Sequence, residues 1–134
     1  MPAALLDTNA VSDLMRDHAQ VKARVGRHAD PIVTSVVVVG EIGYGLNRLP
    51  AAKKRTDLAA RALSILTALR IEPVTELIAD AYGRLKASLE SQGLNLDDND
   101  LWIAATAITH GGLLVTRDQI FSQVPGLQVQ DWSV

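Results

Sequence analysis

Short apolar runs alternate along the chain with longer segments in which apolar residues recur every three or four positions. The short runs are typical of buried strands, and the longer segments are typical of helices that bury one face. The predicted strands are 4–6, 32–35, 71–74, 113–116 and 127–129. The predicted helices are 9–15, 20–28, 36–49, 51–69, 76–92 and 100–110, with a loop or a single helical turn at 118–123. This alternation indicates an α/β protein whose parallel sheet is covered by helices on both faces.

Capping and breaking residues set the helix boundaries. Thr8 or Asn9 is expected to cap the first helix, and Thr75 the fifth. The valines at 36–39 fit either kind of element, because β-branched residues favour strands while apolar residues continue from there at helical spacing. Since Ser35 can cap a helix and Pro50 stops one, we expect the strand to end near Ser35 and a helix to follow.

The composition describes an ordinary core-forming chain. Its 134 residues fit one domain, 1–134, and 48% of them are hydrophobic, which supports a core and argues against disorder. There are no cysteines, which excludes disulfides, thiolate metal sites and cysteine nucleophiles. We find no signal segment, and the apolar runs fall far short of the roughly 20 residues that span a bilayer. We therefore expect a soluble cytoplasmic protein without a membrane partner.

The charge balance does not indicate a bulk nucleic-acid binder. The formal net charge is −2 and the pI is about 5.8. A nuclease remains compatible with these values, since acids that hold a cation contribute to the negative charge. The basic residues Arg48, Lys53, Lys54 and Arg55 fit the solvated ends of surface helices.

Four acids lie beside core-forming segments that are far apart in the sequence. Asp7 and Asp118 follow predicted strands, whereas Glu41 and Asp100 lie on predicted helices. Each alone can be explained as a cap, a dipole contact or a turn residue, although Glu41 lies among glycines and apolar residues and needs a partner. If the fold gathers them, their repulsion requires protons or a hard divalent cation such as Mg²⁺.

Other residues near these acids carry two interpretations each. Four neutral oxygen donors either orient the ligands or form ordinary caps and turns: Thr8, Asn9, Ser12 and Thr116. Arg117 is either a phosphate contact or a member of a surface salt bridge. The histidines show no zinc spacing. Three glycines are expected to allow close helix packing, and two tryptophans to pack in the interior: Gly40, Gly43, Gly45, Trp102 and Trp132.

The segments around the acids resemble those of PIN-domain ribonucleases. They are 5–9 (Leu-Leu-Asp-Thr-Asn), 39–45 (Val-Gly-Glu-Ile-Gly-Tyr-Gly), 99–105 (Asn-Asp-Leu-Trp-Ile-Ala-Ala) and 114–118 (Leu-Val-Thr-Arg-Asp), in that order. The size and the ending at Gln130-Asp131-Trp132 resemble the VapC toxin subgroup of bacterial toxin–antitoxin pairs. The resemblance covers the whole chain.

This resemblance implies a three-layer α/β/α sandwich with a central parallel sheet. It implies an endoribonuclease that cleaves single-stranded RNA, with Mg²⁺ or Mn²⁺ held by Asp7, Glu41, Asp100 and Asp118. Asp98 is an alternative contributor, because Asp97 and Asp98 crowd the third motif. The family's partners are a cognate antitoxin that blocks the site and a second copy in a homodimer.

Two other classes of function compete with this interpretation. An aspartyl phosphatase or receiver-type phosphotransfer domain would use Asp7 as nucleophile. The phosphatase usually carries a second Asp where Asn9 stands, and the receiver carries a lysine near the position of Arg117. A non-enzymatic interaction module would use the acids only as caps, and it would have no reason to bind Mn²⁺.

Overall fold

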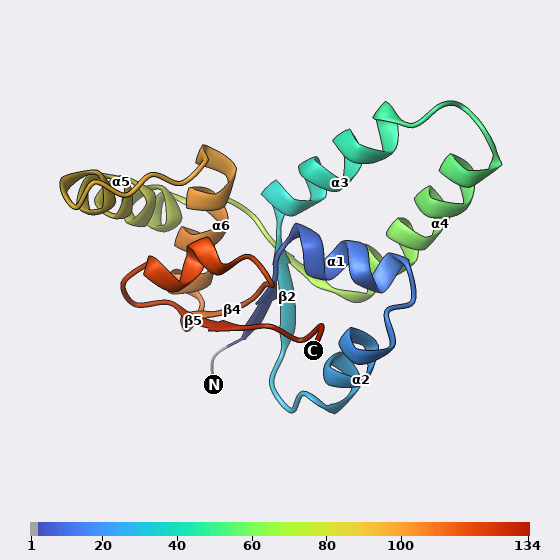
Figure 1. Ribbon diagram of the computed structural model, residues 1–134, viewed down its shortest axis with the longest axis horizontal. Coiled ribbons are helices and arrows are strands. Elements are labelled where there is room, and N and C mark those ends of the chain that lie inside the picture. Colours follow the sequence, from blue (N-terminus) through green and yellow to red (C-terminus); the bar gives the residue numbers. More distant parts are fainter. Residues whose placement is uncertain (1–2) are drawn as a thin grey trace.

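The structure is a computed structural model that describes residues 3–134. One sheet and its covering helices account for the described chain (Figure 1). The strands are β1 Ala4–Leu6, β2 Ile32–Ser35, β3 Arg70–Glu72, β4 Leu113–Val115 and β5 Gln128–Gln130. The α-helices are α1 Thr8–Met15, α2 Ala19–Arg27, α3 Val36–Arg48, α4 Lys53–Ala68, α5 Glu76–Ser91 and α6 Asp98–Thr109, and a 3₁₀ helix, η1, spans Gln119–Gln123.

All five strands pair in parallel, in the order β3-β2-β1-β4-β5. The central strand β1 pairs with β2 on one side and with β4 on the other, so that Leu6 lies opposite Thr34 and Val115. Leu5 and Leu6 have no exposed surface. The first strand of the chain is therefore the middle of the sheet, and the residues that follow β1 and β4 leave the sheet side by side.

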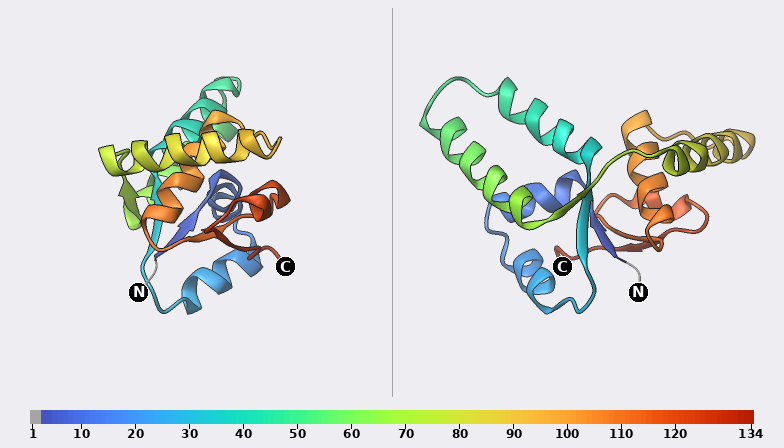
Figure 2. Two further views of the ribbon diagram at one scale, coloured as in Figure 1. Left: turned by 90° about the vertical axis from the view of Figure 1, so that its left-hand side faces the viewer. Right: turned by 180° about the vertical axis from the view of Figure 1, so that it is seen from behind.

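Helices cover both faces of this sheet. α1, α2 and α4 lie on one side, and α5 and α6 lie together on the other (Figures 1 and 2). α3 and α4 form an arm that projects beyond the end of the sheet where β1 and β4 finish (Figure 1). The predicted three-layer α/β/α architecture with a central parallel sheet is confirmed. No helix between residues 3 and 134 is both long and apolar enough to cross a membrane.

Most element boundaries agree with the sequence, and the exceptions have physical causes. Asp7, rather than Thr8 or Asn9, caps α1, because its carboxylate accepts the Ala10 N–H at 2.9 Å. β3 ends before Pro73, which has no N–H to offer a sheet, so the predicted strand 71–74 was placed too late. α6 begins at Asp98 instead of Asp100, so Asp98 joins Asp100 in its first turn.

The valine run is helical, as the spacing predicts. Ser35 ends β2 and caps α3, accepting the Val37 N–H at 3.0 Å. Val38 and Ile42 are the buried residues of this helix. The prediction of close packing at Gly40, Gly43 and Gly45 was wrong, because a Cβ at each position would meet no described atom within 4 Å beyond its chain neighbours and the backbone of its own helix. All three positions therefore have room for a side chain.

Candidate metal centre

Asp7 emerges from the middle of the sheet into a nearly dry position. Its N–H donates to the carbonyl of Val115 at 3.1 Å, continuing the β1–β4 pairing by one residue, and its side chain is only 4% exposed. Burial raises the pKa of Asp7 from 3.8 to about 6, and repulsion from Asp118 acts in the same direction. Hydrogen bonds from Thr116 and from the Ala10 N–H oppose this rise. The Asp7 carboxylate is thus an acid that gains from a nearby cation.

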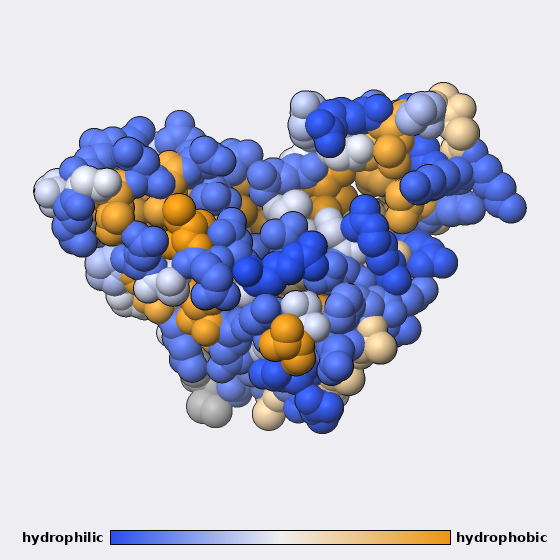
Figure 3. All heavy atoms as spheres, in the orientation of Figure 1, coloured by the Kyte–Doolittle hydropathy of each residue, from blue (hydrophilic) through white to orange (hydrophobic). Residues whose placement is uncertain are grey.

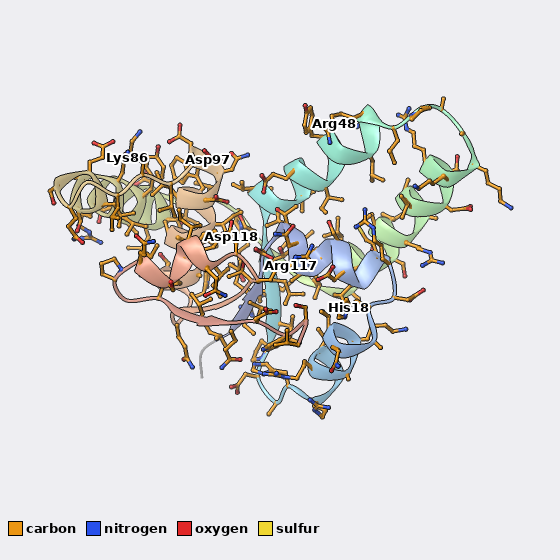
Figure 4. The ribbon with its side chains drawn as sticks, viewed as in Figure 1. His18, Arg48, Lys86, Asp97, Arg117 and Asp118 are labelled. Atoms are coloured by element: carbon orange, nitrogen blue, oxygen red, sulfur yellow. The ribbon has the colours of Figure 1, made fainter. Side chains whose placement is uncertain are left out.

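Asp118 approaches from the adjacent strand through a tight turn. Its N–H donates to the Thr116 hydroxyl at 3.0 Å, and Thr116 itself is 1% exposed. One Asp118 carboxylate oxygen accepts the Ile120 N–H at 3.1 Å and caps η1. The side chain is exposed and lies at the end of the sheet (Figure 4). Thr116 therefore contacts both strand-end acids.

Glu41 reaches the same region from α3 and is held by two donors. The Thr8 hydroxyl donates to one of its carboxylate oxygens at 2.5 Å, and the Asn99 amide donates to the other at 3.4 Å. Glu41 therefore finds the partners that its partly buried position requires. The role of Asn99 was missed by the sequence analysis, and its place next to Asp100 was the only available signal.

The electrostatics of Asp100 join the acids into one cluster. The pKa of Asp100 is raised from 3.8 to about 6. Burial is the largest cause, and repulsion from four other acids adds to it: Asp97, Glu41, Asp118 and Asp7. The other three acids that the sequence selected thus all act on the Asp100 carboxylate, although they come from different parts of the fold. Asp97, the residue just before α6, belongs to this cluster as well, and its side chain makes no capping hydrogen bond.

Asp98 does not join the cluster. Its carboxylate accepts a hydrogen bond from the Tyr82 hydroxyl at 2.8 Å and lies 3.5 Å from the Lys86 ammonium, both on α5. These partners lower the pKa of Asp98. Tyr82 in turn stacks on Trp102, with ring centroids 3.8 Å apart. Asp98 therefore ties α6 to α5, and the alternative that assigned it to the metal site finds no support in its contacts.

Arg117 is engaged within the protein. One of its nitrogens, Nη1, lies 2.9 and 2.8 Å from the two carboxylate oxygens of Asp13. Of the two sequence interpretations, the salt bridge is the one observed. Asp13 is 8% exposed, and the sequence analysis did not single it out, because nothing in its local pattern distinguishes it from a surface acid of α1.

A groove of about 270 Å³ opens beside Glu41 and Thr8, between α1, α3 and α4. Ser12 lies in its wall, so this predicted site residue faces the groove. Its floor is apolar, with Ile42 and Leu46 among its residues, and three cationic side chains line it: Arg16, Arg48 and Lys54. The surface is hollowed between the α5–α6 side and α3, and apolar side chains gather between α3 and α4 (Figure 3).

The donor set fits a hard divalent cation. The available groups are carboxylate, hydroxyl and amide oxygens, which Mg²⁺ and Mn²⁺ accept as ligands. Within residues 3–134, no three acidic or histidine side chains stand in a ready-made cage for an ion. Three of the acids are engaged by partners: Asp7 by the Ala10 N–H, Asp118 by the Ile120 N–H, and Glu41 by Thr8 on one oxygen and Asn99 on the other. Small carboxylate rotations would therefore accompany the binding of an ion.

Comparisons of the sequence with a family model and with known proteins point to the same family. A PIN-domain family model matches residues 4–127. The VapC ribonuclease Y4jK of Sinorhizobium fredii is 31% identical over 131 residues, covering 93% of this chain and 94% of that protein. The ribonuclease VapC2 of Haemophilus influenzae is 30% identical over 130 residues, covering 96% of each chain.

Solved structures agree with the sequence matches. The crystal structure of VapBC2 from Rickettsia felis, bound to a DNA fragment from their promoter, superposes with a TM-score of 0.88 at 27% identity, covering 97% of this chain and 98% of that chain. FitAcB from Neisseria gonorrhoeae superposes with a TM-score of 0.85 at 29% identity, covering 96% and 97%.

Proposed function

Because the chain belongs to the PIN-domain family, we propose that it is a metal-dependent endoribonuclease, the toxin of a toxin–antitoxin pair. It hydrolyses phosphodiester bonds in single-stranded regions of RNA, and it acts in the cytoplasm. The observation that carries this proposal is the electrostatic coupling of Asp100 to Asp7, Glu41 and Asp118 at the carboxyl end of a parallel sheet. Such sheet ends are where α/β proteins place their sites.

Asp7, Glu41, Asp100 and Asp118 hold the divalent cation, Mg²⁺ or Mn²⁺. A bound cation of this kind lowers the pKa of water and stabilises the charge that develops on the phosphate and the leaving oxygen. It also relieves the burial and repulsion that raise the pKa of Asp7 and Asp100 to about 6.

The chain's neutral donors orient these acids. Thr8 donates to Glu41 and fixes one of its oxygens, which leaves the opposite side of the carboxylate directed towards Asn99 and the start of α6. Thr116 contacts the carboxylate of Asp7 and the backbone of Asp118, so that it fixes the positions of these two acids relative to each other. Partners of this kind typically change metal affinity or activity by 10–100-fold when they are removed.

The charged lining of the groove beside Glu41 favours a polyanionic substrate. Arg16, Arg48 and Lys54 line it, so phosphates that flank the scissile bond find cationic partners in a chain whose net charge is −2. Unpaired RNA is favoured because its backbone bends into such a groove and its bases can be splayed apart. The structure of VapBC2 from Rickettsia felis supports a cognate antitoxin as partner. We also propose that the chain forms a homodimer.

A cleavage assay tests this function. The purified protein should cut a labelled single-stranded RNA in Mg²⁺ or Mn²⁺ and should lose this activity when the metal is chelated. Asp7→Asn should abolish cleavage and keep the fold, because asparagine also caps helices. Asp57→Asn, which removes an exposed acid of α4, is the matched control and should cut normally. Full activity in Asp7→Asn would overturn the proposal, as would transfer of labelled phosphate to Asp7 from a phosphodonor.

A further inference from the structure

Asp13 is a buried acid that the proposed metal site does not use. It lies on α1, six positions beyond Asp7, and is 8% exposed. A charge in such a place is retained only where a partner compensates the loss of water. That partner is Arg117, whose Nη1 lies within 2.9 Å of both Asp13 oxygens.

The ion pair connects α1 to the turn that carries Asp118, because Arg117 lies in that turn. Arg117 stands between Thr116 and Asp118 in the turn that follows β4. The hydrogen bond from the Asp118 N–H to Thr116 holds the inner side of the turn, and the Arg117 side chain ties the turn to α1. In Figure 4, Arg117 lies next to Asp118 on the side of α1. The direction of the exposed Asp118 side chain therefore depends on contacts on both sides.

We propose that Asp13 is a positioning residue that acts through Arg117. By holding the guanidinium, Asp13 fixes the turn 116–118 so that Asp118 faces the other three acids. This inference rests on the proposed function, because it takes Asp118 as a metal ligand. It also assigns the Arg117 guanidinium, whose side chain is 46% exposed, to the contact with Asp13 and not to a contact with substrate phosphate.

Metal binding measured on a set of variants tests the proposal. Mn²⁺ is titrated calorimetrically into the wild type, Asp13→Asn, Arg117→Gln and the double variant, each confirmed as folded by circular dichroism. Each single variant should raise the Kd for Mn²⁺ about tenfold. The double variant should be no weaker than either single one, because both changes break the same contact. Asp13→Glu, which keeps the charge, should recover most of the affinity.

A second ion pair of the same chemistry provides the control. Arg61 donates to Asp17 at 2.8 Å, just beyond the end of α1 and away from the acids. Arg61→Gln should leave the Kd for Mn²⁺ unchanged. The proposal is refuted if the wild type binds Mn²⁺ and both single variants bind it equally well. It is also refuted if Arg117→Gln raises the KM for RNA while Asp13→Asn does not, since Arg117 would then contact phosphate. A wild type that binds no Mn²⁺ would instead remove the proposed function itself, and this inference with it.

Discussion

Replacing Asp7 by asparagine should stabilise the metal-free protein at neutral pH. The substitution removes a negative charge from a side chain that is 4% exposed, and it keeps an oxygen that can accept the Ala10 N–H. The pKa of Asp7 rises from 3.8 to about 6 on folding, mainly through burial. Each pKa unit of that rise corresponds to about 1.36 kcal/mol, so the ionisation of Asp7 lowers the free energy of unfolding by about 3 kcal/mol.

The sign of this effect fixes its pH dependence. Below the unfolded pKa of 3.8, Asp7 is protonated in both states, so the wild type and Asp7→Asn should be equally stable. Between pH 3.8 and the folded pKa of about 6, the unfolded chain loses the Asp7 proton while the folded wild type keeps it, so the folded wild type loses stability as the pH rises. The advantage of the variant therefore grows through this window and is complete above pH 7.

Denaturant unfolding followed by circular dichroism at pH 4 and pH 8, with chelator present, measures this difference. Thermal unfolding in the same buffers provides a second measurement: for a domain of this size, a gain of about 3 kcal/mol corresponds to a midpoint roughly 10 °C higher. Asp57→Asn should show no such gain at either pH. Adding Mn²⁺ should reduce the advantage of Asp7→Asn, because only the wild type gains from binding the ion. Equal stability of the two proteins at pH 8 in chelator would refute the reasoning.

Three further outcomes follow from contacts described above. Thr8→Val, which removes the hydroxyl that donates to Glu41, should raise the Kd for Mn²⁺ about tenfold in a calorimetric titration, and an unchanged Kd would show that Glu41 needs no orientation. Asp98→Asn should leave RNA cleavage unchanged because its carboxylate is directed to Tyr82 and Lys86, and a loss of cleavage would return Asp98 to the site. Trp132→Ala should lower the free energy of unfolding by about 3–5 kcal/mol in a urea titration, since this ring is 1% exposed; a change below about 1 kcal/mol would contradict its place in the core.

Most helix and strand boundaries could be predicted, because the capping and breaking residues that set them act on positions only a few residues away. Ser35 separates a strand from a helix within one apolar stretch, and this boundary followed from capping chemistry alone. The cap of α1 was assigned to Thr8 or Asn9 although Asp7 provides it. All three residue types cap helices well, and the choice depends on the backbone angle at which β1 ends.

The acids of the proposed site could be selected from the sequence, but the residues that contact them could not. Asp7 and Asp118 follow strands, Asp100 stands at the start of a helix, and Glu41 lies inside a mostly apolar helix, all of which is visible in the sequence. The contact between Asp13 and Arg117 joins residues at opposite ends of the chain, and no local pattern encodes it. Asp98 and Asp97 are neighbours with the same side chain, and only the presence of Tyr82 and Lys86 on α5 separates their roles. The open surroundings of Gly40 likewise depend on what the fold leaves unfilled.

The position of β1 at the centre of the sheet determines when the site can assemble during translation. β1 leaves the ribosome first, but its two neighbours are β2, from residue 32, and β4, from residue 113. A nascent chain that lacks β4 has an open sheet edge and lacks Asp118, so it holds an incomplete set of acids. Pairing between segments so distant in sequence is also slow to form. With the proposed metal site, nuclease activity arises only after β4 and Asp118 have been synthesised, which leaves an interval in which a binding partner can meet the chain before it is able to cut RNA.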